Sequence, residues 1–169
     1  MNFPRILKKR KGYIDRIKPF MQKSVVKVLT GQRRVGKSFL LYQLIEEILA
    51  KEPDANIIYV NLEDFTFSSL QTAEDLHSYI ISHSKEKVKN YIFIDEIQDI
   101  PGFEKVIRSL LLNEDNDIYI TGSNAKMLSG ELATYLSGRY IEFKIYSLSY
   151  SEFLEFHGLT ESETSYELY

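Results

Sequence analysis

The chain has 169 residues, of which 44% are hydrophobic and 27% are charged, and these proportions suit one globular domain with a sizeable core. It contains no cysteine, which excludes a disulfide framework, thiolate chemistry and zinc–cysteine sites. No apolar run approaches the roughly 18 residues that would cross a bilayer, and residues 1–16 lack the apolar core of a signal peptide, so we expect a cytoplasmic protein without membrane contact.

Charge is unevenly distributed along the chain, although the net charge is only −3. Residues 1–27 carry nine Lys or Arg and one Asp, whereas residues 149–169 carry five Glu and no Lys or Arg. A basic arm of this kind can bind nucleic acid, but it is more often a solvated helix face. Nucleic acid is therefore a possible partner that no other feature of the sequence supports.

Residues 1–24 are predicted to form a basic segment that is helical in its second half and packs on the main domain. Tyr13, Ile14, Ile17 and Met21 fall on one side of that helix, and Pro19 is expected to end or bend it. The main domain is predicted to span residues 25–158.

Residues 25–29 predict a buried strand, because the run is short and rich in β-branched side chains. Apolar residues at helical spacing then predict a helix that ends near residue 51. Between these elements Gly31, Gly36, Lys37 and Ser38 fit the pattern G-x-x-x-x-G-K-[ST], which is the P-loop. The glycines permit turns that a Cβ would forbid, so that successive backbone N–H groups can surround phosphate oxygens.

The loop is therefore predicted to bind a nucleotide through Gly31, Gln32, Arg33, Arg34, Val35, Gly36, Lys37, Ser38 and Phe39. Lys37 is expected to reach the β- and γ-phosphates, and the Ser38 hydroxyl is expected to bind Mg²⁺. The two arginine side chains either contact phosphate or an acid, or remain solvated. The alternative for the whole motif is a glycine-rich turn that binds nothing.

Residues 57–62 predict a second buried strand, after which Thr72 and Asp75 form the capping box of a helix. Residues 91–94 predict a third strand, and it ends in Asp95 and Glu96. Ligands of open parallel sheets bind at the carboxyl ends of the strands. Asp95 is thus predicted to hold Mg²⁺ through water and Glu96 to act as general base, the alternative being two solvated acids at a strand end.

Pro101 is predicted to open the next helix, and residues 118–120 predict a fourth strand. After that strand, Ser123 or Asn124 is predicted to touch the γ-phosphate or to orient water, although a simple turn is the alternative. The remaining predicted elements are a helical region over 128–136, a strand over 140–145 and a helix that the Ser149–Glu152 capping box begins. Strands that alternate with helices predict an α/β fold with a central parallel five-stranded sheet flanked by helices.

Four segments together resemble a family of prokaryotic predicted ATPases with an AAA-type domain. They are GQRRVGKS, YIFIDEIQ, TGSN and LSGRY, which begin at residues 31, 91, 121 and 136, and the resemblance covers roughly residues 6–156. It implies a three-layer P-loop nucleoside-triphosphatase fold of the additional-strand type, in which the fourth strand lies between the P-loop strand and the strand that carries the acids.

The resemblance also implies ATP as the ligand, the turn at Ser123 and Asn124 as a sensor, and Arg139 as an arginine finger. Such a finger would act on a neighbouring subunit in a homo-oligomer. The alternative is that Arg139 pairs with an acid such as Glu142 or Glu131 and anchors the helix to the sheet. Members of the family usually continue into a second, C-terminal domain. Residues 159–169 are therefore interpreted as an acidic tail at a truncation or at the start of such a domain.

The sequence thus predicts Mg²⁺-dependent binding of ATP and its slow hydrolysis to ADP, in a cycle that serves as a switch or motor. A GTPase would need a guanine-reading Asn-Lys-x-Asp stretch, which is absent. A small-molecule kinase would need an arginine-rich lid and an acceptor pocket. The remaining alternative is a nucleotide-dependent adaptor or regulatory module that binds ATP without significant turnover.

Overall fold

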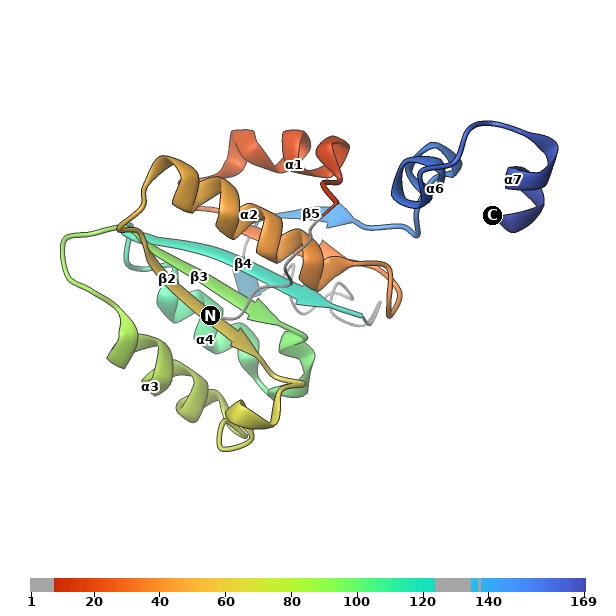
Figure 1. The fold of residues 1–169 in the computed structure, drawn as a ribbon. Helices are drawn as coiled ribbons and strands as arrows, with labels where there is room; N and C mark the ends of the chain where they lie inside the picture. Colours follow the sequence, from red (N-terminus) through yellow and green to blue (C-terminus); the bar gives the residue numbers. More distant parts are fainter. Residues whose placement is uncertain (1–7, 124–134, 137) are drawn as a thin grey trace.

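The computed structural model describes residues 8–123, 135, 136 and 138–169, and it has three layers, a central sheet with helices on both faces (Figure 1). In this part of the chain the parallel sheet consists of β1 (Val26–Thr30), β2 (Asn56–Asn61), β3 (Asn90–Asp95), β4 (Asn116–Gly122) and β5 (Tyr140–Lys144). The strand order is β2-β3-β4-β1-β5. It places β4 between β1 and β3, which confirms the predicted additional-strand topology.

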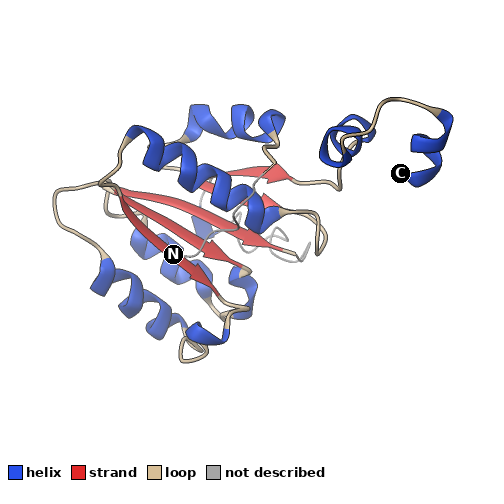
Figure 2. Ribbon diagram, in the orientation of Figure 1, coloured by secondary structure: helices blue, strands red, loops and turns tan. Residues whose placement is uncertain are grey.

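The described helices are α1 (Lys11–Ile17), α2 (Lys37–Lys51), α3 (Ala73–His83), α4 (Phe103–Leu110), α6 (Tyr150–His157) and α7 (Glu163–Leu168). Short 3₁₀ turns are η1 (Lys18–Phe20), η2 (Phe65–Phe67) and η3 (Ile97–Asp99). Figure 2 shows α1 and α2 on one face of the sheet and α3 and α4 on the other. None of the described helices combines the length and the apolar character needed to cross a membrane.

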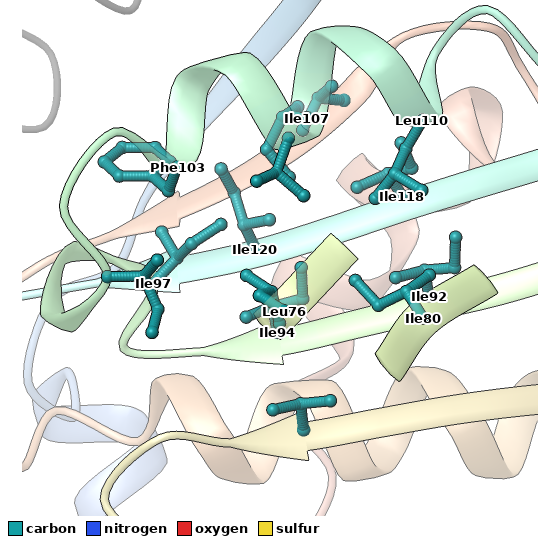
Figure 3. Close-up of a cluster of buried hydrophobic side chains, with 14 of the residues drawn as sticks. Leu76, Ile80, Ile92, Ile94, Ile97, Phe103, Ile107, Leu110, Ile118 and Ile120 are labelled. Carbon is teal, nitrogen blue, oxygen red and sulfur yellow. The ribbon is translucent and has the colours of Figure 1, made fainter. Parts of the chain in front are cut away.

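The alternation of side chains along β3 divides the interior into two hydrophobic cores, one on each face of the sheet. Ile92 and Ile94 pack toward α3 and α4, whereas Tyr91 and Phe93 pack toward α1 and α2. Both faces of β3 are covered, so all its residues are buried, and between Asn90 and Asp95 its sequence is a continuous apolar run. Figure 3 shows the first core, in which side chains from α3 and α4 meet those of β3 and β4.

The second core fixes the P-loop helix on the sheet. From α2 it takes Leu40, Leu41, Leu44, Ile45 and Ile48, and α1 adds Ile14 and Ile17. Fully burying an aliphatic side chain of this size contributes about 1.5–3 kcal/mol. The P-loop therefore leads into a helix that is held on the sheet along its length.

Most predicted element boundaries are confirmed to within one or two residues, and both predicted capping boxes form, at the starts of α3 and α6. Pro19 lies in η1, directly after α1 ends. Helix α4 begins at Phe103 rather than at Pro101, because Gly102 takes a left-handed conformation (φ 75°) as the residue before the helix. The helical region predicted over 128–136 lies mostly outside the described residues, which include helical Tyr135 and Leu136 there.

Beyond β5, helices α6 and α7 lie to one side of the sheet (Figure 1). The acidic stretch 159–169 carries α7, which begins with a further capping box formed by Ser162 and Ser165. Tyr150 of α6 packs edge to face with Tyr166 and Tyr169, so aromatic contacts join α7 to α6.

A buried ion pair between Lys27 of β1 and Asp117 of β4 lies near the amino ends of the strands. Both side chains are fully buried, and Asp117 also accepts hydrogen bonds from the Gln22 N–H and the Tyr119 hydroxyl, each at 2.8 Å. Burial lowers the pKa of Lys27, and the charge of Asp117 opposes that change. Each charge therefore depends on the other to remain in the interior.

We predict that Asp117→Asn will lower the free energy of unfolding by about 3–5 kcal/mol, because the change leaves the Lys27 ammonium buried without its counter-charge. Urea denaturation followed by circular dichroism measures the loss. Asp54→Asn, at an exposed turn, is the matched control and is expected to change stability little. An Asp117→Asn variant as stable as this control would contradict the interpretation.

Candidate functional site

The P-loop connects β1 to α2 at the edge of the sheet where the parallel strands end. Gly31 and Gly36 have φ angles of 154° and 95°, in a region that favours glycine. A Cβ on Gly31 would lie 2.2 Å from the carbonyl oxygen of Ile145, so the close approach of the chain after β5 also requires glycine. The conformation of the loop therefore explains why both positions of the motif are glycine.

Lys37 is the first residue of α2, and its side chain is only 3% exposed. Its Nζ donates hydrogen bonds to the carbonyls of Gly31 and Gln32, at 3.2 and 3.1 Å, and lies 3.2 Å from Glu96 Oε1. A cation is therefore held inside the loop, in contact with a carboxylate from the end of β3.

Glu96 takes the left-handed conformation (φ 56°, ψ 49°), which is uncommon for residues other than glycine. The resulting turn separates the two consecutive acids: Glu96 contacts Lys37, whereas Asp95 is held between β2 and β4. The Asp95 carboxylate accepts hydrogen bonds from the Thr121 hydroxyl and, at 3.3 Å, from the Tyr59 hydroxyl. Thr121 Oγ1 also accepts the Glu96 N–H at 2.9 Å, which stabilises the turn. Backbone strain of this kind costs about 1–3 kcal/mol and is concentrated at functional sites.

Gln98 in η3 orients the Glu96 side chain. Its Nε2 donates to Glu96 Oε2 at 2.6 Å and to Ser123 Oγ at 3.5 Å. Because an ionised carboxylate only accepts, the amide nitrogen must face Glu96, and the amide oxygen has no hydrogen-bond partner among the described residues. Burial acts to raise the pKa of Glu96, but hydrogen bonds from Gln98 and Ser123 and the charge of Lys37 outweigh it and lower the pKa. Glu96 is therefore ionised at neutral pH.

A cavity of about 500 Å³ opens over these groups. Its walls carry three cationic side chains, the Ser38 hydroxyl and two carboxylates; the charged residues are Arg33, Arg34, Lys37, Glu63 and Glu96. Arg33 Nη2 lies 3.4 Å from Glu63 Oε1, and both side chains are exposed. The Arg33–Glu63 pair therefore lies at the surface, whereas Lys37 and Glu96 are the buried charged pair of the cavity wall.

A second cavity of about 840 Å³ adjoins the first and shares Arg34, Gly36 and Phe39 with it. Its other walls include Phe153 and Phe156 of α6. A cationic cavity and a larger, partly aromatic cavity therefore meet at the start of α2.

The structure brings together most residues that the sequence predicts for the site. Lys37, Ser38, Asp95 and Glu96 occur at one edge of the sheet, and Ser123 lies beside Gln98 there. Asn124 lies outside the described residues. Asn61, at the end of β2, accepts a hydrogen bond from the Glu63 N–H.

Arg139 lies at the opposite edge of the sheet. It directly precedes β5, and its carbonyl accepts the N–H of Val26 at the start of β1. The P-loop begins after Thr30, about 13 Å further along the strand at a rise of about 3.3 Å per residue. Arg139 is exposed and forms no ion pair within the described part of the chain, so the site of its own subunit does not include it.

Sequence reasoning missed Thr121, Tyr59 and Gln98 as site residues. In the sheet register Ile120 pairs with Ile94, so Thr121 comes beside Asp95, and Tyr59 lies on the neighbouring strand. The proximity of Thr121 to Asp95 could have been predicted from the strand order that the family resemblance implied. Gln98 lies two residues after Glu96 and contacts it because Glu96 is left-handed. No sequence pattern predicts that conformation for a glutamate.

Comparison with known proteins is consistent with this geometry. A family model described as AAA domain matches residues 23–154. An uncharacterized protein of Haemophilus influenzae is 44% identical over 152 residues, which cover 86% of this chain. The chain spans only 37% of the length of that relative.

Two solved structures share the fold at low sequence identity. The Aeropyrum pernix ORC1 protein in complex with DNA has a TM-score of 0.62 at 14% identity, over 98% of this chain and 51% of the other. The replication initiator DnaA bound to AMPPCP and single-stranded DNA has a TM-score of 0.59 at 15% identity, over 96% and 57%. The fold, the P-loop with its acidic partner strand and the match over residues 23–154 lead to one conclusion: the chain belongs to the AAA domain family.

Proposed function

We propose that this chain binds ATP with Mg²⁺ and hydrolyses it slowly, in a cycle that serves as a switch or motor. The observation that carries the proposal is the contact between Lys37 and Glu96, 3.2 Å apart inside the P-loop. This contact combines a cation for the phosphates with a carboxylate that can accept a proton from water. A phosphate-binding module without chemistry would need only the cation.

The cavity over Lys37, called the phosphate compartment from here on, has the cationic lining that a triphosphate would need. Left-handed backbone at Arg34 and Gly36 curls the loop in front of α2. Such a loop presents N–H groups inward, and the amino end of the helix adds its positive dipole. A phosphate would take the place that Glu96 now occupies at Lys37, because both anions compete for the same ammonium.

Ser38, which lines this cavity, and Asp95, which directly precedes Glu96 in the chain, would hold Mg²⁺. The Ser38 hydroxyl and the Asp95 carboxylate are hard oxygen donors, and the described residues contain no cluster of three or more His, Cys, Asp or Glu that could form a full metal cage. Mg²⁺ at phosphate sites uses one or two protein ligands together with water and phosphate. The ion would neutralise charge on the phosphates.

The adjoining aromatic cavity supports a nucleotide rather than inorganic polyphosphate as ligand. Phe39, Phe153 and Phe156 offer apolar surface for a base, directly beside Gly36 of the phosphate compartment. The fold neighbour DnaA is bound to AMPPCP, an ATP analogue, which supports the same choice of ligand. ADP is the expected product.

The roles of the two acids give a first prediction. Glu96→Gln is expected to keep ATP and Mg²⁺ bound and to slow hydrolysis by about 10²–10⁴-fold, because only the proton acceptor is lost. Asp95→Asn is expected to weaken the dependence on Mg²⁺ itself. Single-turnover rates measured against Mg²⁺ concentration separate the two effects, and identical behaviour of the variants would contradict this division of roles.

The contacts of Gln98 give a second prediction. Gln98→Ala removes the 2.6 Å hydrogen bond that orients Glu96, so the single-turnover rate is expected to fall by about tenfold or more while the Kd for ATP stays within about twofold. Gln71→Ala, at an exposed glutamine outside the site, is the control. Unchanged hydrolysis in Gln98→Ala would show that Glu96 needs no such support.

Arg139 is proposed to act on the site of a neighbouring subunit in a homo-oligomer, because its position excludes a role in its own site. An arginine finger raises turnover by about 10³–10⁵-fold, so a monomer is expected to bind ATP but to hydrolyse it poorly. We predict that mixing inactive Arg139→Ala with inactive Lys37→Ala will restore activity, since one subunit supplies the arginine and the other the intact loop. A mixture that stays inactive, while the wild type is active and oligomeric, would contradict the shared site.

A further inference from the structure

We infer that Arg10 is a positioning residue that joins the P-loop to helix α6 and thereby sets the nucleoside side of the site. The inference rests on the proposed function and concerns a residue outside every motif of the sequence. Arg10 precedes α1, yet only 4% of it is exposed. A buried guanidinium is costly unless its donors are satisfied.

Every guanidinium N–H group of Arg10 has an acceptor. Nε and Nη2 donate to the two carboxylate oxygens of Glu152, at 2.8 and 2.9 Å. Nη1 donates to the carbonyls of Val35 and Tyr146, at 3.0 and 2.9 Å, and Nη2 also donates to the Ser147 carbonyl at 3.3 Å. One side chain thus contacts the P-loop, the segment after β5 and α6.

The backbone of Arg10 is itself fixed to the P-loop helix. Gln43 of α2, which is 1% exposed, accepts the Arg10 N–H and donates to the Lys8 carbonyl, both at 3.0 Å. The Arg10 guanidinium also lies 4.5 Å from the centre of the Tyr13 ring. These contacts fix the position of the guanidinium between α2 and α6.

The Val35 contact acts on the phosphate side. Val35 directly precedes Gly36, and its carbonyl accepts from Arg10 at 3.0 Å. A carbonyl held in this way is not presented to a phosphate, which it would repel, so the loop keeps its N–H groups for the ligand.

The Glu152 contact acts on the nucleoside side. Glu152 belongs to the first turn of α6, and its carboxylate also accepts the Ser149 N–H at 2.9 Å in the capping box. Phe153 and Phe156, which line the aromatic cavity, follow on the same helix. The distance of that wall from the P-loop is therefore set by the bidentate pair between Arg10 and Glu152.

The test compares two ligands, ATP and inorganic tripolyphosphate, each with Mg²⁺, by calorimetric titration of the full 169-residue chain. Tripolyphosphate needs only the phosphate compartment, whereas ATP needs both. Glu152→Gln keeps the shape of the side chain and removes its charge, so ATP binding is expected to weaken by about tenfold or more, with tripolyphosphate binding within about twofold of wild type. Arg10→Lys keeps the charge but loses the planar fork, and ATP binding is expected to weaken more than tripolyphosphate binding.

Lys9→Gln is the matched control, because Lys9 is the neighbouring cation but pairs with Glu47 at the surface and lines neither cavity. It is expected to leave both affinities unchanged. If Arg10→Lys does not fold, as judged by circular dichroism, Glu152→Gln alone decides the question. Where turnover is measurable, Glu152→Gln is also expected to raise KM without lowering kcat, because binding common to substrate and transition state is lost.

The outcomes separate this inference from the proposed function. A wild-type chain that binds neither ligand would contradict the proposed function. A wild type that binds ATP, with Glu152→Gln unchanged for ATP or weakened equally for ATP and tripolyphosphate, would contradict the role of Arg10 and leave the proposed function standing.

Discussion

The contact between Lys37 and Glu96 is the interaction on which the rest of the site depends. It places opposite charges 3.2 Å apart with side chains that are 3% and 7% exposed. Removing two charges from water is unfavourable unless geometry and further hydrogen bonds compensate. Here the carbonyls of Gly31 and Gln32 satisfy the ammonium, and the Gln98 amide satisfies the carboxylate. Under the proposed function, a bound phosphate would replace Glu96 at the Lys37 ammonium, and the released Glu96 carboxylate would then be available as a base.

The sheet makes this contact possible by its strand order. With β4 between β1 and β3, the P-loop and the acidic pair are separated by the width of one strand, and Thr121 is the next-to-last residue of that strand. The Thr121 hydroxyl can therefore reach both Asp95 and the Glu96 N–H. The two cores hold the sheet and α2 rigid, so the separation between cation and carboxylate is fixed by packing rather than by the loop alone.

Much of the fold could be predicted from the sequence, because its signals are local. The β-branched runs, the helical spacing after the P-loop and the capping box at Thr72 and Asp75 each specify their element within a few residues. Strand order is not a local property, and it came from the resemblance of whole motifs to a family. The start of α4 differed from the prediction because Gly102, and not Pro101, controls the turn.

The grouping of Lys37, Ser38, Asp95 and Glu96 at one edge of the sheet was predictable, because these residues belong to recognisable sequence motifs at strand ends. The site was not predictable where a contact depends on tertiary structure. Arg10 belongs to a basic run that is typical of a solvated helix face. It is nevertheless buried, because the fold brings Glu152, 142 residues later in the chain, into hydrogen-bond contact with it. Gln98 likewise acquires its contact from a left-handed residue, a conformation that a glutamate rarely adopts.

The most direct measurement of the central claim is a calorimetric titration of Mg²⁺ and ATP into the wild type, Lys37→Met and Lys51→Met. Lys51, exposed at the end of the same helix, controls for the loss of one positive charge. Removing a buried charged contact costs about 2–5 kcal/mol, so Lys37→Met is expected to weaken binding by about 30-fold or more while Lys51→Met binds like the wild type. Equal ATP affinity in wild type and Lys37→Met would contradict the account, because the buried ammonium would then not be the phosphate-binding charge.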